Sequence, residues 1–270
     1  MIDKDEAASG ALRRAALATL VLAHMLFAGT AALAQAPAGP ARVAVLSLIG
    51  ERLLIVGSNM STGSRLDRNA REFIDLPADD FDLTTARDFE LRARREKPGT
   101  ALVAIRSRDK VLREMQEDVL AGRREVKDLA ARLRPALGPQ GITHLVLVTK
   151  YRGDARIRIA DGAIGLGRLE GLGFYVDRWT PMVRADIGAR GSGFLAPFAY
   201  FTATLLEVAT LEVLAQASAA EAAAFGTTDA PGATHPWDAL DAEQKTKALR
   251  EFVRRGLEQV VPKIAARLPG

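Results

Sequence analysis

The chain contains no cysteine, and this absence excludes several kinds of site at once. Disulfide cross-links, thiolate nucleophiles and cysteine-based zinc sites all require this residue. The lipid anchor of a bacterial lipoprotein is also attached through a cysteine and is therefore excluded. Because 48% of the residues are apolar, a sizeable hydrophobic core is available to stabilise the fold instead.

Histidine is scarce, since the chain has three and His24 lies in the N-terminal segment. Neither His144 nor His235 has a partner at metal-ligand spacing, so we expect no metal site. His235 precedes a Pro-Trp pair and is expected to order that loop. A serine hydrolase would need one of these two histidines, and the nearest candidate nucleophiles are Ser61 and Ser64. Glycine-rich phosphate-binding motifs are absent, so the sequence predicts no cofactor.

The chain also has no large excess of positive or negative charge. The chain has 37 basic and 33 acidic residues, a net charge of +4, and the two signs are interspersed. This pattern is typical of a solvated mixed surface rather than a basic nucleic-acid interface. We therefore expect no nucleic-acid partner.

The N-terminal segment has the layout of a bacterial secretory signal peptide. Arg13 and Arg14 precede an apolar run over Ala15–Ala28, and Ala32-Leu33-Ala34 supplies small residues for a cleavage site. We predict a signal peptide over 1–34 and a periplasmic location. The alternative is an uncleaved inner-membrane anchor over 15–34, which is long enough to cross a bilayer and would be the protein's contact with the membrane.

The remainder predicts one α/β (α+β) domain over 42–268, after a flexible leader at 35–41. We expect a mixed, partly antiparallel sheet packed by helices. The predicted strands are 42–49 and 53–56, joined as a hairpin at Gly50-Glu51, then 72–76, 102–105, 143–151, 198–208 and 211–219. One predicted helix begins at Asp82 or Thr84 and ends near Lys97. Two more are predicted from the apolar faces over 111–119 and 126–137.

The C-terminal part predicts a long amphipathic helix. Asp241 and Gln244 form a capping box, and apolar residues recur at helical spacing from Leu249 to Ile264. Pro262 is expected to kink this helix or to separate its last turn.

A glycine-rich stretch at about 153–193 holds nine glycines and predicts a β insertion with loops. Aromatic residues gather in and after this stretch, at Phe174, Tyr175, Trp179, Phe194, Phe198, Tyr200 and Phe201. Exposed aromatic residues are typical of contact surfaces. We take Phe174, Tyr175, Trp179 and Phe194 as the candidate binding surface.

Several segments resemble the periplasmic α/β domain of curli-secretion-type and penicillin-binding-protein-activator lipoproteins. They are the strand Val43–Leu46, Gly141–His144 leading into Leu145–Val148, and the closing strands 200–208 and 211–214 before a terminal helix. The resemblance covers 42–265 and implies a periplasmic accessory role with no catalytic residues. The chain departs from these families because no cysteine follows its signal.

Together these features predict an exported, non-enzymatic periplasmic accessory protein. Its partner would be an envelope protein or a glycan. The alternatives are a periplasmic serine-type hydrolase built on the residues named above, or a small-ligand binding protein that uses the aromatic, glycine-rich region.

Overall fold

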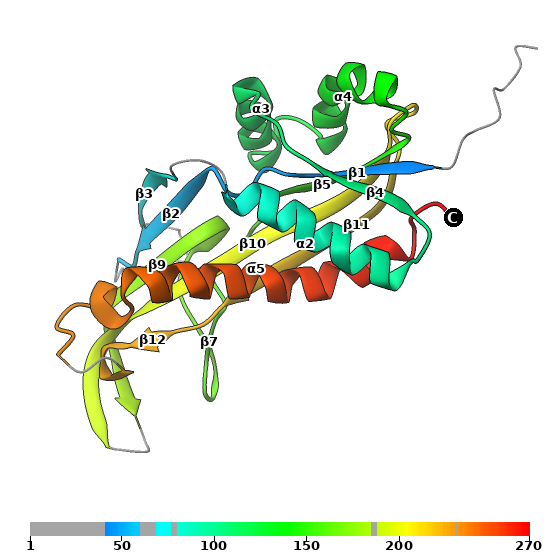
Figure 1. Ribbon diagram of the computed structural model, residues 1–270. Helices are drawn as coiled ribbons and strands as arrows, with labels where there is room; N and C mark the ends of the chain where they lie inside the picture. The colour runs from blue at the N-terminus through cyan, green and yellow to red at the C-terminus, as the bar shows by residue number, and fades with distance from the viewer. Residues whose placement is uncertain (1–40, 60–68, 77–79, 185–187, 230–231) are drawn as a thin grey trace, which may run out of the picture. The chain divides into compact units, whose positions relative to one another are not determined.

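The computed structural model describes residues 41–59, 69–76, 80–184, 188–229 and 232–270. Its main sheet is built around one long strand, β10 (Ala189–Glu207; Figure 1). Every residue of β10 from 193 to 206 is buried. One edge of β10 pairs with β9 (Arg168–Arg184) and then with β5 (His144–Lys150). The other edge pairs with β12 (Phe225–Gly226) and then with β11 (Val213–Ala222).

Because β9 and β5 follow one another along the same edge of β10, the sheet divides into two halves. We call one the β2 half, in which β9 pairs with β2 (Arg52–Gly57) and β2 with β3 (Ala70–Asp75). We call the other the β1 half, in which β5 pairs with β1 (Arg42–Ser47) and β1 with β4 (Ala101–Ile105). The full strand order is β3-β2-β9-β10-β5-β1-β4.

The predicted hairpin of β1 and β2 is wrong. β1 is parallel to β5 and β2 is parallel to β9, and both β5 and β9 are antiparallel to β10. β1 and β2 therefore run in the same direction, and the chain steps from one half of the sheet to the other at Gly50. A side chain at Gly50 would place its Cβ 2.6 Å from the Cβ of Phe81, so the step packs tightly against the next helix.

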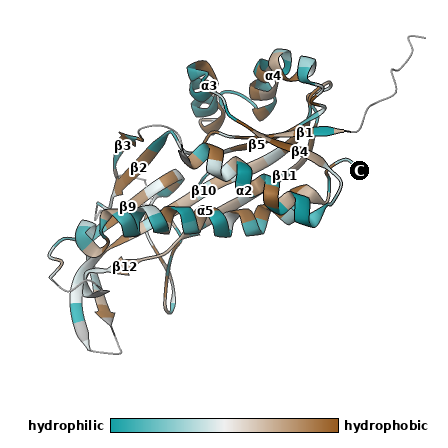
Figure 2. Ribbon diagram, viewed as in Figure 1, coloured by the Kyte–Doolittle hydropathy of each residue, from teal (hydrophilic) through white to brown (hydrophobic). Residues whose placement is uncertain are grey.

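Helices cover both faces of the β1 half. α2 (Asp80–Glu96) and the C-terminal α5 (Ala242–Ala265) pack on one face, through a core that includes Phe89, Phe201 and Leu257. α3 (Lys110–Leu120) and α4 (Val126–Leu137) pack on the opposite face. Polar and apolar residues both recur along α2 and α5 (Figure 2), as in helices that bury one face. Among the described residues, no helix is both long enough and apolar enough to cross a membrane.

The β2 half is covered differently. On one face, a short excursion packs through Ala155 and Ile157, in a core cluster that also contains Leu169 of β9. The excursion consists of β6 (Arg152–Asp154), β7 (Ile157–Ile159) and β8 (Gly162–Ile164). The other face is partly covered by the start of α5 and by the 3-10 helix η3 (Pro236–Ala239). Two further 3-10 helices are η1 (Gly138–Gln140) and η2 (Thr227–Asp229). The edge strand β3 is exposed along its whole length.

The predicted fold class is confirmed, since the protein is an α+β structure with a mixed sheet and a long C-terminal helix. The capping box of Asp241 and Gln244 is present as predicted. Helix α5 continues through Pro262 to Ala265, so its last turn is not separated. Asp82 lies inside α2 rather than capping it, because its carboxylate accepts hydrogen bonds from Ser47 Oγ (2.7 Å) and the Gly50 amide (2.9 Å).

β10 begins nine residues before the predicted start at Phe198, since it starts at Ala189. The strand includes Pro197, although proline cannot donate a hydrogen bond to a neighbouring strand. In the structure Pro197 pairs with Phe174 on one side and lies at the interruption between β12 and β11 on the other. A proline is tolerated there because the ladder is already broken.

Candidate functional site

Both tryptophans of the chain line one groove in the β2 half. The groove has a volume of about 480 Å³ and lies over β2, β3 and β9, beside η3. Its apolar lining is completed by Ile55, Ile74 and Val176. This volume is within the range of small-molecule sites, roughly 300–1,000 Å³. We call it the tryptophan groove.

Trp179 is projected by a bulge in β9. Ser192 pairs with Pro181 and Phe194 pairs with Asp177, so residues 178–180 stand opposite the single residue Gly193. The amides of Trp179 and Thr180 both donate to Asp177 Oδ1, at 2.8 and 2.7 Å. A bulge of this kind turns side chains away from their regular direction, and the Trp179 side chain is 58% exposed.

Gly193 is required opposite this bulge. It has a φ of +83°, and a Cβ at this position would lie 2.4 Å from the Asp177 carbonyl oxygen and 2.6 Å from Pro236 Cγ. Only glycine adopts this conformation at such close approach without strain. The glycine therefore brings the bulge of β9 and the segment that carries the second tryptophan together.

Trp237 is fixed in η3 on the other side of the groove. Its amide donates to Nδ1 of His235 at 3.1 Å. The Trp237 ring packs edge-on against Phe174, with centroids 5.4 Å apart, and Lys245 Nζ lies 4.4 Å from its centroid. Burial lowers the pKa of Lys245, although Asp238 and Asp241 act in the opposite direction. These contacts hold the indole in one position.

Polar side chains surround the aromatic residues and carry both signs of charge. They are Ser58, Asn59, Glu72, Arg178 and His235. Since Nδ1 of the neutral His235 ring accepts the Trp237 amide, the ring proton is on Nε2, which is a hydrogen-bond donor. The groove thus offers one carboxylate acceptor, together with guanidinium and imidazole donors, next to apolar ring faces.

Of the four aromatic residues predicted as a binding surface, Trp179 is the one whose side chain is exposed. Phe174 packs under Trp237, while Tyr175 and Phe194 stack on each other in the core at 5.9 Å. Trp237 was not among the predicted residues. The available signal was its rarity, because the chain has only two tryptophans.

The two histidines of the described chain lie at opposite ends of β10. His144 pairs with Glu207, whereas the residue after His235 lies against Gly193. These positions are 14 residues apart on one strand, roughly 45 Å along its length. Ser61 and Ser64 lie outside the described residues. A single site containing both histidines is therefore excluded.

His144 has a local structural environment. Its Nδ1 lies 2.9 Å from Thr143 Oγ1. Burial lowers the pKa of His144, and the nearby Glu207 offsets part of this effect. In the portion of the chain that the structure describes, no group of three histidine, aspartate or glutamate residues is placed to hold a metal ion.

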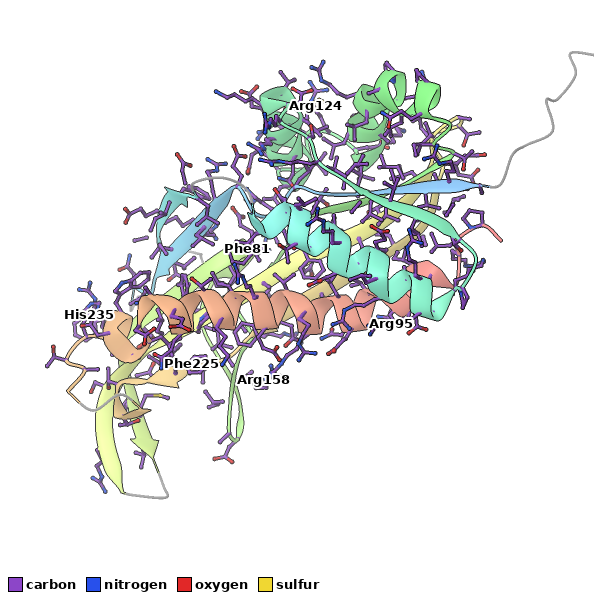
Figure 3. The ribbon with its side chains drawn as sticks, viewed as in Figure 1. Phe81, Arg95, Arg124, Arg158, Phe225 and His235 are labelled. Carbon is purple, nitrogen blue, oxygen red and sulfur yellow. The ribbon has the colours of Figure 1, made fainter. Side chains whose placement is uncertain are left out.

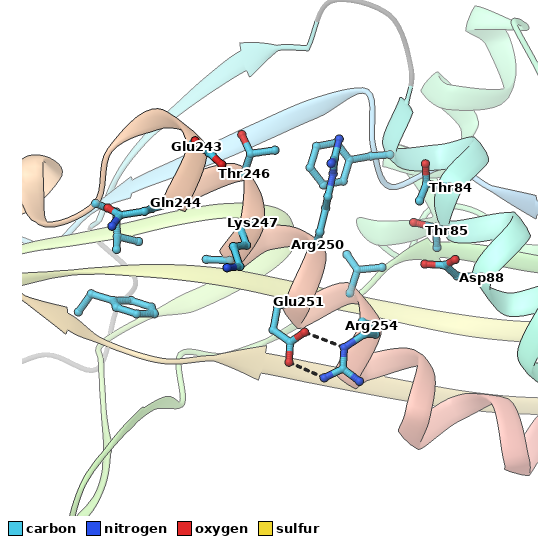
Figure 4. A pocket seen from close by; sticks show the side chains of 15 residues that line it. Thr84, Thr85, Asp88, Glu243, Gln244, Thr246, Lys247, Arg250, Glu251 and Arg254 are labelled. Atoms are coloured by element: carbon cyan, nitrogen blue, oxygen red, sulfur yellow. Dashed lines mark hydrogen bonds and ion pairs between the residues drawn. The ribbon is translucent and has the colours of Figure 1, made fainter.

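A larger depression of about 770 Å³ lies over α5 and extends to α2 (Figure 4). Its lining includes Phe81 and Phe225, which lie on opposite sides of α5 (Figure 3), so the depression wraps around the helix. Hydrogen bonds from Arg254 and Arg255 lower the pKa of Glu251 to about 2. Within this lining, Glu251 and Arg254 are thus paired with each other, as on an ordinary helix surface.

No protein-family model and no curated protein matches the sequence. Among solved structures, the hypothetical protein CT253 from Chlamydia trachomatis aligns with 10% identity and a TM-score of 0.29, over 84% of this chain and 99% of that one. A neuraminyllactose-binding hemagglutinin homolog from Helicobacter pylori aligns with 7% identity and a TM-score of 0.30, over 87% and 86%. Protein XCC0632 from Xanthomonas campestris, of family model DUF330, aligns with 10% identity and a TM-score of 0.26, over 84% and 88%. TM-scores in this range do not establish a shared fold.

Proposed function

We propose that the chain is an exported, non-enzymatic binding protein of the bacterial envelope, and that its tryptophan groove holds a glycan. The observation that carries this proposal is the convergence of both tryptophans on one groove. They come from segments far apart in the sequence, and each is positioned by its own contacts. A groove of this kind is suited to recognition by shape and stacking.

The chemistry of the groove suits a sugar ring. A pyranose has an apolar C–H face that packs on an indole ring, and hydroxyl groups at its edge that both donate and accept hydrogen bonds. The two tryptophans supply the ring faces. Glu72 supplies an acceptor, and Arg178 and His235 supply donors.

Location in the envelope is supported by the signal-peptide layout of 1–34 and by the resemblance to periplasmic lipoprotein domains. Mass spectrometry of the protein expressed in a Gram-negative host tests this part. We expect the mature protein to begin at Gln35 and to be released with the periplasmic fraction. An intact N-terminus in the membrane fraction would support the inner-membrane anchor instead.

Isothermal titration with soluble muropeptides and with lipopolysaccharide core oligosaccharide tests the binding proposal. We expect Trp179→Ala to weaken glycan binding about tenfold or more, because it removes one of the two stacking faces. Val183→Ala is the matched control, since Val183 is an exposed apolar residue of the same strand, 65% exposed, and does not line the groove.

Equal loss of affinity in both variants, or no binding of either glycan, would contradict the proposal. Crosslinking in the periplasm that is abolished by Trp179→Ala and captures an envelope protein without any glycan would assign the groove to a protein partner.

A further inference from the structure

A second pocket lies at the point where the chain diverges around β1. From β1 the chain passes through β2, β3 and α2 to β4, and from β4 it passes through α3 and α4 to β5. The three strands are parallel, and the helices on the two routes cover opposite faces. In open α/β sheets, ligands bind outside the carboxyl ends of strands at such a divergence.

A pocket of about 370 Å³ occupies this position. It is lined by Glu51 after β1, by Arg106 and Arg108 after β4, by Lys110 and Arg113 of α3, and by Asp75 and Leu76 at the end of β3. Four cationic side chains thus face two carboxylates. The pocket does not overlap the tryptophan groove.

The positive charge of this pocket is only partly neutralised within the described chain. Arg113 Nη1 donates to Glu51 at 2.7 Å, but Arg113 Nε is buried and has no hydrogen-bond partner. A buried donor without a partner is costly, so Glu51 satisfies Arg113 only in part. Arg108 and Lys110 are exposed and form no ion pair among the described residues.

Two neighbouring cations, Arg52 and Lys150, differ from Arg108 and Lys110 because each is paired with a carboxylate. Glu117 accepts hydrogen bonds from both Lys150 (2.5 Å) and Arg52 (3.0 Å). Burial raises the pKa of Glu117, but these two cations outweigh it and the pKa is lowered overall. The structure therefore pairs Lys150 and Arg52 with the carboxylate of Glu117, whereas Arg108 and Lys110 in the pocket have no ion-pair partner among the described residues.

We propose that this pocket binds a phosphoryl group, such as that of a phosphate monoester or a phospholipid headgroup. A tetrahedral anion complements the cations Arg108 and Lys110, and arginine forks bind phosphate oxygens in pairs. The binding is independent of the tryptophan groove and of its ligand.

Calorimetric titration of the full chain at low ionic strength tests the proposal, with inorganic phosphate and pyrophosphate as probes. We expect Arg108→Gln combined with Lys110→Gln to weaken binding about tenfold or more. The matched control is Arg123→Gln combined with Arg124→Gln, at the other end of α3, where both arginines pair with Asp118. It changes the net charge equally and should change the affinity less than about twofold.

Vesicles of phosphatidylglycerol, with phosphatidylcholine as the neutral reference, separate the two sources of the phosphoryl group. Pocket-dependent binding of the free anions assigns a soluble ligand. Pocket-dependent binding of phosphatidylglycerol vesicles alone assigns a lipid headgroup, and either result supports the site. If the protein bound neither the free anions nor the phosphatidylglycerol vesicles, or if the control variant lost as much affinity, the proposal would be overturned. Either result would leave glycan binding to the tryptophan groove unaffected.

Discussion

The two halves of the sheet differ in how they are covered. The β1 half has helices on both faces, and its edge strand β4 is protected by α2. The β2 half has a fully exposed edge strand, β3, and an open groove on one face. We therefore expect the β1 half to contribute most to the stability of the fold, and the β2 half carries the proposed glycan site.

The largest expected difference concerns the core. Leu147 on β5 is fully buried between the sheet and the layer of α3 and α4, whereas Ile74 on β3 is 41% exposed. We expect Leu147→Ala to lower the free energy of unfolding by about 3 kcal/mol because it leaves a cavity. Ile74→Ala should cost less than about 1 kcal/mol. Urea unfolding measures both, and similar costs would contradict the division into two halves.

A smaller effect is expected at the bulge that projects Trp179. Gly193→Ala should lower the free energy of unfolding by about 2 kcal/mol, through backbone strain and the close approach of Asp177, and should also weaken glycan binding. Gly188→Ala is the matched control, because Gly188 has a φ of +65° but no atom within 4 Å of the added Cβ. If both variants lost stability equally and bound glycan normally, the role assigned to the bulge would be wrong.

A smaller effect on stability is expected from the two edge strands of the sheet, β4 and β3. Glu90 accepts the Ala104 amide at 2.9 Å, and Arg94 donates to the Leu102 carbonyl at 2.5 Å, so side chains of α2 satisfy the outer groups of β4. Glu90→Ala should cost about 1 kcal/mol and promote self-association, because an unpaired strand edge recruits other chains. Sedimentation velocity checks the association. Glu72→Ala on the already exposed β3 should change neither property.

The smallest expected effect is on pH dependence and arises from His144 in the β1 half. Burial lowers its pKa below the ordinary value of 6.5, so the folded state binds a proton less readily than the unfolded state. Stability from the neutral ring is therefore complete above pH 6.5 and declines as the pH falls toward the folded pKa. The urea midpoint should fall more between pH 7.5 and pH 5.5 in the wild type than in His144→Gln. An identical fall in both would exclude this contribution.

The β1 half could be predicted from the sequence because its signals are local. The continuous apolar runs at 43–46 and 145–148 and the helical spacing of α3 and α4 each indicate one element. The division of the sheet could not be predicted, because β2 pairs with β9, which lies more than a hundred residues further along the chain. The hairpin prediction failed for this reason, since Gly50-Glu51 has the composition of a turn but joins two strands that run in the same direction.

The tryptophan groove was predicted only in part. Trp179 was named from its aromatic character, but its exposure depends on the bulge opposite Gly193, which the glycine pattern alone does not locate. Trp237 and Glu72 reach the groove from η3 and β3, and no local pattern connects these segments. The site is therefore a product of tertiary packing.

The central claim is that Trp179 and Trp237 form one binding site, and intrinsic fluorescence tests it most directly. Since the chain has only these two tryptophans, Trp237→Phe and Trp179→Phe each leave a single indole as the reporter. On titration with soluble muropeptides, we expect the emission of the remaining indole to change in both variants. In each variant, the midpoint of this change should equal the midpoint of glycan binding measured by calorimetry. A response from only one indole, or from neither while the glycan still binds, would contradict the claim.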